Sequence, residues 1–177
     1  LNPLILECDG LLTTFNALLR IANIEAGKRH SAFHPVNLGS VMEDVIDLYE
    51  PLAGEKSVTL TLNRQCCTIM GDKDMLFQAM ANLVDNAIKY TPQGGSVAIT
   101  VTKQKHGGQI VIADTGHGIP DAHKHQVFRR FYRVDSCRAQ PGSGLGLSLV
   151  AAVIKLHQGE ITLSDNTPSG LTVTVAL

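Results

Sequence analysis

Residues 82–90, with the sequence NLVDNAIKY, combine an apolar helix face with a polar stripe. Asn82, Asn86 and Lys89 are spaced i, i+4 and i+7, so a helix brings them onto one side. Amide oxygens are hard, neutral ligands that suit Mg²⁺, and a lysine supplies positive charge for a phosphate. The stripe therefore indicates a metal–phosphate contact, with a solvated helix face as the alternative.

The surrounding sequence predicts a domain that mixes helices and strands. The helix that carries the stripe is expected to begin after Asp72, a suitable N-cap, and to end at Tyr90, before Pro92. Hydrophobic periodicity predicts two more helices, 38–55 and 145–157. It also predicts two strands, 58–62 and 68–70, then a strand pair, 96–102 and 109–113, joined through Gly107-Gly108, and a final pair, 160–164 and 171–176. This order favours a mixed or antiparallel sheet with helices on one face.

The start of the chain predicts one long helix, Pro3 to Ala26, with Asn2 as its N-cap and Gly27 at its end. Its apolar residues recur in steps of four and three, as in a heptad repeat. They are Leu4, Cys8, Leu11, Phe15, Leu18 and Ala22. This seam favours a coiled-coil or bundle partner, with packing on the chain's own domain as the alternative. The polar stretch 27–35 is expected to be a linker.

Two glycine-rich segments flank a basic stretch. DTGHG (114–118) follows an apolar strand, so Asp114 is expected at a buried strand end, where its carboxylate requires donors such as the adenine amine. GSGLGL (142–147) precedes a helix and presents free N–H groups to a phosphate, without matching a P-loop or a dinucleotide fingerprint. We call residues 119–142 the lid segment, because a cationic stretch between glycine hinges suits a nucleotide lid. A capped glycine turn and an ordinary amphipathic helix are the structural alternatives.

These stretches, in this order, resemble four motifs of the histidine kinase catalytic domain, within the wider gyrase/Hsp90-like ATP-binding superfamily. NLVDNAIKY resembles the N box, DTGHG the G1 box, residues 128–133 (FRRFYR) the F box and GSGLGL the G2 box. The resemblance spans residues 35–177. In addition, residues 22–27 (ANIEAG) resemble the end of the second helix of the family's dimerisation hairpin.

The resemblance implies an α+β fold of the Bergerat type. This is an α/β sandwich in which a mixed sheet carries three helices on one face, here preceded by one long N-terminal helix. The implied divisions are residues 1–27, half of the dimerisation hairpin; residues 28–34, a linker; and residues 35–177, the ATP-binding catalytic domain.

The resemblance also implies ATP and Mg²⁺ as cofactors and a role for each matched residue. Asn86 would ligate Mg²⁺, Asp114 would accept a hydrogen bond from the adenine amine, and Arg133 would stabilise charge during transfer. Asn82 would support the magnesium site and, with Arg133, is an implied catalytic position. The positions implied to bind nucleotide are Asn82, Asn86, Lys89, Tyr90, Asp114, Gly116, Gly118, Ile119, Phe128, Gly142, Ser143, Gly144, Leu145, Gly146 and Leu147.

One position bears on the type of reaction. ATP-hydrolysing members of the superfamily carry a Glu four residues before the magnesium Asn, where it activates water. Asn82 occupies that position here and cannot act as a base, so the resemblance favours phosphoryl transfer. The family's phosphoacceptor box, a His followed by an acidic residue and usually an Arg-Thr-Pro run, is absent from the sequence, so the acceptor histidine is expected elsewhere.

The implied partners are ATP or ADP, the missing helix of the hairpin and, in the full-length protein, a response regulator receiver domain. The unpaired seam also predicts self-association through residues 3–26. A net charge of −1 gives no general attraction to nucleic acid. No apolar run approaches the roughly 18 residues that cross a bilayer. The four cysteines include no C-x-x-C pair and are expected to be reduced thiols of a cytosolic protein, so cytoplasmic placement is expected, with any membrane anchor in other parts of a full-length protein. Two functional alternatives remain: a degenerate nucleotide-binding regulatory module and a hydrolase of the same superfamily.

Overall fold

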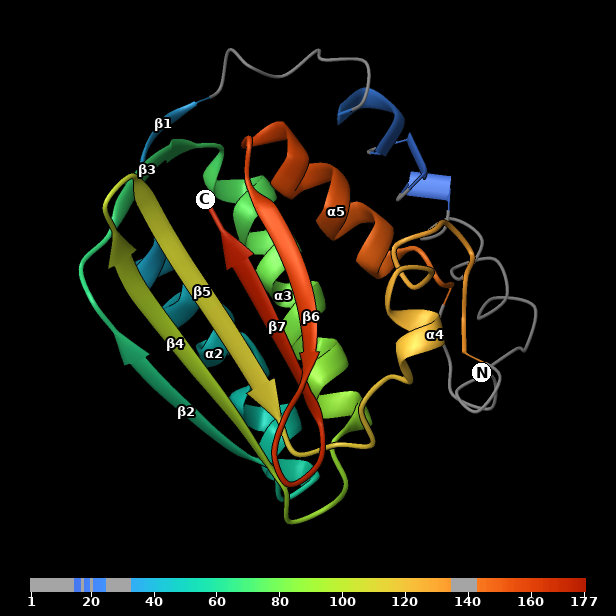
Figure 1. The fold of residues 1–177 in the computed structure, drawn as a ribbon. Coiled ribbons are helices and arrows are strands. Elements are labelled where there is room, and N and C mark those ends of the chain that lie inside the picture. The colour runs from blue at the N-terminus through green and yellow to red at the C-terminus, as the bar shows by residue number, and fades with distance from the viewer. Residues whose placement is uncertain (1–14, 17, 20, 25–32, 135–142) are drawn as a thin grey trace, which may run out of the picture.

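The computed structural model describes residues 15–16, 18–19, 21–24, 33–134 and 143–177. Its labelled elements are drawn in Figure 1. The strands are β1 (His34–Asn37), β2 (Thr59–Arg64), β3 (Thr68–Gly71), β4 (Ser96–Gln104), β5 (Gly107–Asp114), β6 (Glu160–Asp165) and β7 (Leu171–Ala176). The helices are α2 (Leu38–Glu55), α3 (Lys73–Tyr90), α4 (Asp121–Lys124) and α5 (Gly146–Leu156). Among the described residues, no helix is both long and apolar enough to cross a membrane.

Five strands form the main sheet in the order β2-β4-β5-β7-β6. Strands β2 and β4 pair in parallel and the other neighbours pair antiparallel, so the sheet is mixed, as predicted. Helices α2, α3 and α5 cover one face (Figure 1). Alternate residues of the strands point into this layer and are at most 6% exposed: Val97, Ile99, Val101, Ile110, Ile112, Val173 and Val175. The expected α/β sandwich with three helices on one face is confirmed.

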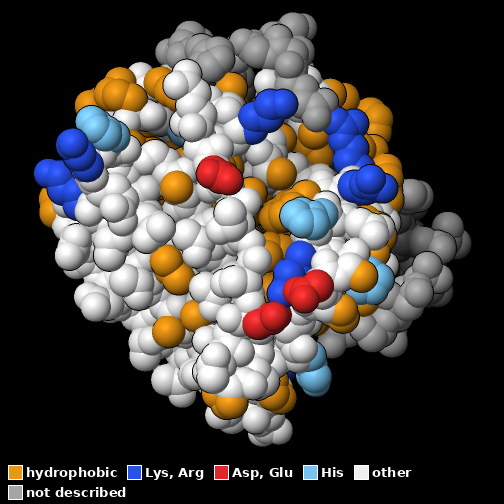
Figure 2. Space-filling view, in the orientation of Figure 1, with side chains coloured by type: hydrophobic (Ala, Val, Ile, Leu, Met, Phe, Trp, Pro, Cys, Tyr) orange, Lys and Arg blue, Asp and Glu red, His pale blue; other side chains and the backbone are white. Residues whose placement is uncertain are grey.

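The opposite face of the sheet, turned to the viewer in Figure 2, is nearly free of charge. The outward-facing positions on the five strands are mostly Thr, Ser, Ala and Gln, and Glu160 is the one charged residue among them. An antiparallel sheet commonly keeps one polar, solvated face. Because one face is solvated and the other is buried, outward threonines alternate with inward valines and isoleucines along the same strands.

Side-chain caps fix the starts of the two long helices. Asn37 Oδ1 accepts hydrogen bonds from Gly39 N (2.9 Å) and Ser40 N (3.3 Å) at the start of α2. Asp72 Oδ1 accepts from Met75 N at 3.1 Å at the start of α3, as predicted. Each cap satisfies N–H groups that have no partner within the helix.

Lys56, which follows α2, closes the far end of α3. Its Nζ donates to the carbonyl oxygens of Ile88 (2.8 Å) and Lys89 (2.7 Å). These carbonyls lie in the last turn of α3, where acceptors lack helical partners and the helix dipole favours a cation. The contact ties the ends of two helices that are far apart in the sequence.

The small sheet β1-β3 was not predicted. Strand β1 pairs antiparallel with β3 and begins at His34, inside the stretch expected to be a linker. His157, after α5, supports this corner: its Nε2 accepts from Asp72 N at 3.0 Å and its ring stacks on Phe33 at 4.7 Å. The His157 ring thus lies against the start of α3.

Most of the predicted helix 3–26 lies outside the described residues. The described residues between 15 and 24 are helical. Ile21 (1% exposed) and Ile24 (6%) are buried in the core of the domain, while Phe15 (59%) and Leu19 (46%) are exposed. One side of this helix therefore packs on its own domain and another side stays open.

Gly107 and Gly108 do not form the turn between β4 and β5, which is a correction. Both belong to β5, and the turn is made by Lys105 and His106. A Cβ on Gly107 would lie 1.8 Å from Leu177 O, and one on Gly108 would lie 2.5 Å from Cys67 Sγ. Gly108 and Leu177 exchange backbone hydrogen bonds of 2.7 and 2.9 Å. The glycines are therefore needed for close approach and not for a turn.

Candidate functional site

Asp114 is the last residue of β5 and points into the layer between sheet and helices, where it is 5% exposed. Its Oδ1 accepts from Gly116 N (2.8 Å) and Leu171 N (3.1 Å), and no described residue donates to Oδ2. Burial raises the pKa of the Asp114 carboxyl, and the two backbone hydrogen bonds oppose this shift. One oxygen is thus fixed by the fold, and the second is available to a ligand that donates a hydrogen bond.

The glycines after Asp114 permit close backbone contacts. A Cβ on Gly116 would lie 2.5 Å from Tyr90 O, at the end of α3. Gly118 has a φ of +70° and lies against Gly170, whose oxygen would be 3.0 Å from an added Cβ. The loop therefore fits between α3 and the turn that joins β6 to β7. The close contacts at these two glycines are with protein backbone, and their contact with a ligand remains a prediction.

The turn between β6 and β7 holds Asp114 in place, which the sequence did not indicate. Asn166 Nδ2 donates to Asp114 O at 2.7 Å. Gly170, with a φ of +116°, leaves only enough room for a hydrogen, because a Cβ would lie 1.9 Å from Asp114 O. The residues Asn166-Thr167-Pro168-Ser169-Gly170 are typical of a turn, but nothing in them shows what the turn contacts.

At the other end of the site, Asn82 meets the start of α5. Asn82 Nδ2 donates to Gln78 O at 2.9 Å within α3. Its Oδ1 would be 3.1 Å from a Cβ on Gly146, the first residue of α5. Leu145, at the N-cap position of α5, offers no side-chain cap, so the first N–H groups of this helix have no side-chain acceptor. The structure thus brings the N box and the G2 box together.

The remaining polar residues of α3 lie between these two ends. Asn86 is half-buried, and its side chain makes no hydrogen bond to a described residue. Lys89 Nζ lies 5.6 Å from the centre of the Tyr90 ring. Burial raises the pKa of Asp85, one turn before Lys89, and the charge of Lys89 partly opposes this rise. Asn86 therefore has an amide free for a ligand on the same helix as Asn82.

The lid segment contacts the glycine loop before α5. Phe131 N donates to Gly144 O at 3.0 Å, and Arg133 Cγ would be 3.2 Å from a Cβ on Gly144, whose φ is +71°. Gly142 lies outside the described residues, and Ser143 is exposed. The end of the described lid segment therefore lies beside Gly144 of the G2 box.

For the other predicted site residues, a role in nucleotide binding remains a prediction. Phe128 lines a cavity of about 250 Å³ with Ile161 and Leu163 of β6. Ile119 and Leu147 are half-buried and Leu145 is buried. A contact of these three residues with nucleotide remains a prediction. A second cavity, of about 550 Å³, lies between residues 23–24, Tyr49 and α3, and touches the site only at Asn82.

Within the described residues, no group of three or more His, Cys, Asp or Glu side chains could hold a metal ion. The Asn86 side-chain amide, which makes no hydrogen bond to a described residue, has an oxygen of the kind that a hard cation binds. With bound phosphate oxygens supplying further ligands, one protein oxygen suffices for Mg²⁺.

Comparison with known proteins gives a consistent match. The model of the family described as histidine kinase-, DNA gyrase B- and HSP90-like ATPases matches residues 71–177. Hybrid signal transduction histidine kinase D of Dictyostelium discoideum is 38% identical, over 95% of this chain and 11% of that protein. Sensor protein kinase PmrB of Pseudomonas aeruginosa is 34% identical, over 96% of this chain and 36% of that protein. The first relatives are thus much longer, and this chain spans between 11% and 47% of their lengths.

Solved structures share the fold. The mycobacterial sensor histidine kinase MprB aligns with a TM-score of 0.72 at 30% identity, covering 82% of this chain and 96% of that one. Full-length ShkA in complex with AMPPNP aligns with a TM-score of 0.83 at 26% identity, covering 94% of this chain and 35% of that one.

Proposed function

Because this chain belongs to the family of histidine kinase-, DNA gyrase B- and HSP90-like ATPases, we propose that it binds Mg-ATP and transfers the γ-phosphoryl group to a histidine outside the chain. The observation that carries the proposal is Asp114, a buried carboxylate at a strand end with one oxygen held by two backbone N–H groups and the other without a described donor. A buried carboxylate is stabilised by a further donor, and the exocyclic amine of adenine is such a donor.

The phosphate end of the site is at Asn82 and the start of α5. The uncapped N–H groups of α5 favour an anion, and the helix dipole adds to this preference. Asn86 would hold the magnesium ion and Lys89 would contact a phosphate oxygen. The metal would neutralise charge on the phosphates.

The residues favour transfer over hydrolysis. Asn82 is an amide whose nitrogen donates to Gln78 O, so this side chain has no basic atom to activate water. Arg133, beside Gly144, stabilises the charge that develops on the transferred group. The imidazole acceptor belongs to another part of the full protein, because the sequence lacks the family's phosphoacceptor box.

The proposed partners rest on the family resemblance and on the exposed side of the N-terminal helix. Residues 1–27 form half of a dimerisation hairpin, 28–34 connect it, and 35–177 form the catalytic domain, which works in the cytoplasm. The missing hairpin helix contacts the open side of the helix, where Phe15 and Leu19 are exposed. A response regulator receives the phosphoryl group. Sedimentation of this chain alone is expected to show self-association, and a monomer at high concentration would contradict that part of the proposal.

Calorimetric titration tests the site directly. ADP and a non-hydrolysable ATP analogue are added with and without Mg²⁺, and binding with micromolar affinity is expected. Phosphotransfer is then measured by mixing the chain and labelled ATP with a hairpin fragment that carries the acceptor histidine. If no nucleotide binds, the catalytic proposal is wrong. Sustained phosphate release without transfer would instead indicate a hydrolase.

A further inference from the structure

Two neighbouring residues at the end of β6 contact two different parts of the site. Asp165 forms an ion pair with the lid segment, and Asn166 forms a hydrogen bond with the backbone of Asp114. The two residues are adjacent in the chain, with Cα atoms about 3.8 Å apart, so the two contacts lie close together. The turn therefore connects the lid segment to the carboxylate proposed to bind adenine.

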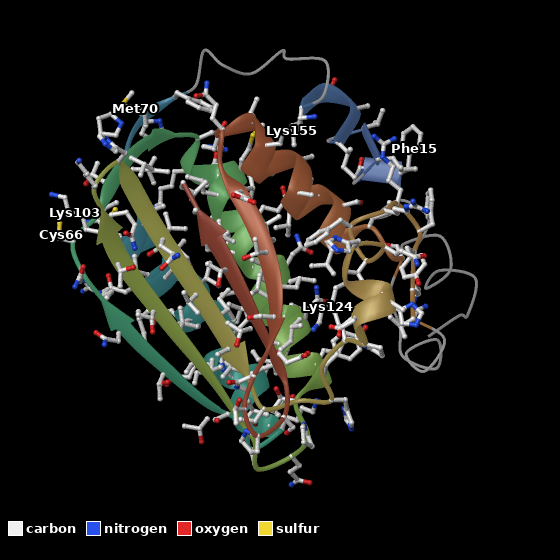
Figure 3. All side chains as sticks on the ribbon, in the orientation of Figure 1. Phe15, Cys66, Met70, Lys103, Lys124 and Lys155 are labelled. Atoms are coloured by element: carbon white, nitrogen blue, oxygen red, sulfur yellow. The ribbon has the colours of Figure 1, made fainter. Side chains whose placement is uncertain are left out.

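The contact with the lid segment is made by Lys124, in helix α4. Its side chain is 13% exposed, and its Nζ donates to Asp165 Oδ1 at 2.7 Å and to Asp121 Oδ1 at 2.6 Å. Figure 3 shows Lys124 extending from α4 toward the end of β6. Hydrogen bonds to Asp121 and Asp165 raise the pKa of Lys124, so it keeps its charge at neutral pH. Asp121 belongs to α4 itself, so only the Asp165 pair joins separate elements.

The contact with Asp114 is also specific in geometry. Asn166 Nδ2 donates to Asp114 O at 2.7 Å, Asn166 N donates to Gly170 O at 3.0 Å, and Thr167 N donates to Asn166 Oδ1 at 3.0 Å. The Asn166 side chain is thus held on both of its polar atoms. Leu171, just beyond the turn, donates to Asp114 Oδ1. The position of Asp114 therefore depends on this turn at two oxygen atoms, its backbone O and its side-chain Oδ1.

We propose that Lys124, Asp165 and Asn166 are positioning residues that couple the place of helix α4 in the lid segment to the nucleotide-binding carboxylate of Asp114. The proposal rests on the proposed nucleotide function and adds to it a mechanical link. Displacement of α4 pulls on Asp165, and through the adjacent Asn166 it changes the position of Asp114. Nucleotide bound at Asp114 in turn stabilises the turn and, through Asp165, the docked position of α4.

The test compares substitutions of the two aspartates that pair with Lys124. Asp165→Asn and Asp121→Asn each remove one carboxylate from Lys124, but only Asp165 lies on the turn. Hydrogen exchange of residues 121–134 is measured without nucleotide, and ADP affinity is measured by calorimetry. Asp165→Asn is expected to speed exchange in this stretch and to weaken ADP binding about threefold, the range of an exposed ion pair. Asp121→Asn is expected to leave ADP affinity unchanged.

Two further variants separate coupling from loss of a single contact. Asn166→Ala is expected to weaken ADP binding about tenfold, because it removes the hydrogen bond to Asp114 O. Lys124→Met combined with Asp165→Asn is expected to weaken binding no more than either change alone. The coupling would be overturned by equal effects of Asp121→Asn and Asp165→Asn on ADP affinity, or by unchanged hydrogen exchange of the lid segment in Asp165→Asn. In either case, nucleotide binding by the wild type would still support the proposed function. If the wild type binds no ADP, both proposals are wrong.

Discussion

Replacing Asp114 with Asn changes one atom of the site and keeps its shape. Asp114 Oδ1 accepts from two backbone N–H groups, Gly116 N and Leu171 N. An asparagine keeps those two hydrogen bonds only if its oxygen takes the place of Oδ1. Its NH₂ group then occupies the place of Oδ2, where it faces the adenine amine with a donor instead of an acceptor.

The expected loss of affinity follows from this geometry. A hydrogen bond to a charged group contributes about 1.5–3 kcal/mol, and a donor left facing a donor costs about 1–3 kcal/mol. Together they amount to about 2.5–6 kcal/mol, which corresponds to a dissociation constant about 60- to 20,000-fold higher. ADP binding should fall below detection in a calorimetric titration of ordinary concentration.

The folded chain should not lose stability from the same change. Burial raises the pKa of Asp114, so the protonated acid is the form that the fold favours. That contribution is fully present below the unfolded pKa and is lost as pH rises through the folded pKa. At neutral pH the wild type therefore holds an unfavourable buried charge, and Asp114→Asn should melt at the same or a higher temperature. At pH values below the unfolded pKa the difference should shrink.

Binding should show the opposite dependence on pH. The carboxylate is the form that accepts from adenine, so ADP affinity should rise as pH passes through the raised pKa and then level off. Asp47→Asn, an exposed position on α2, is the matched control and should change neither affinity nor melting temperature. An Asp114→Asn variant that binds ADP within threefold of the wild type would refute the reasoning.

Three other changes test separate contacts. Lys56→Met removes two hydrogen bonds from the end of α3 and should lower the melting temperature by about 3–6 °C, for a loss of about 1–2 kcal/mol; an unchanged melting curve would contradict this. Gly170→Ala places a Cβ 1.9 Å from Asp114 O and should abolish ADP binding, whereas Gly54→Ala, with no atom within 4 Å, should slightly stabilise the chain, as thermal melting and titration would show. Asn86→Ala should remove the gain in ATP-analogue affinity from Mg²⁺ and leave magnesium-free ADP binding unchanged; a persisting magnesium effect in calorimetry would assign the metal to another residue.

The sequence predicted the long elements and the motif positions, because these depend on local patterns. The apolar period and the Asp72 cap specify α3, and the glycines at 116 and 118 indicate close backbone approach. The alternation of Thr with Val or Ile specifies which face of the sheet is buried. Such signals lie within a few residues of each other, so no knowledge of the tertiary structure is needed to interpret them.

Contacts between distant segments could not be predicted in this way. Strand β1 has only four residues, too few for a period, and exists because β3 lies beside it. No residue near Lys56 in the sequence indicates its hydrogen-bond partners, because they lie 32 and 33 residues later. Asn166 looked like a turn residue, and its partner Asp114 lies 52 residues earlier. In each case the physical cause is a neighbour that the fold supplies.

The two ends of strand β5 lie far apart, so a label can be attached near one end and away from Asp114 at the other. One end of this strand carries Asp114, and the other end exchanges hydrogen bonds with Leu177 through Gly108. Six residues of extended chain separate Gly108 from Asp114, about 20 Å. A surface tether or a dye attached after Leu177 would therefore be remote from the nucleotide. Immobilising the chain by that end should leave ligand access, and the measured binding rate, unaffected by the attachment.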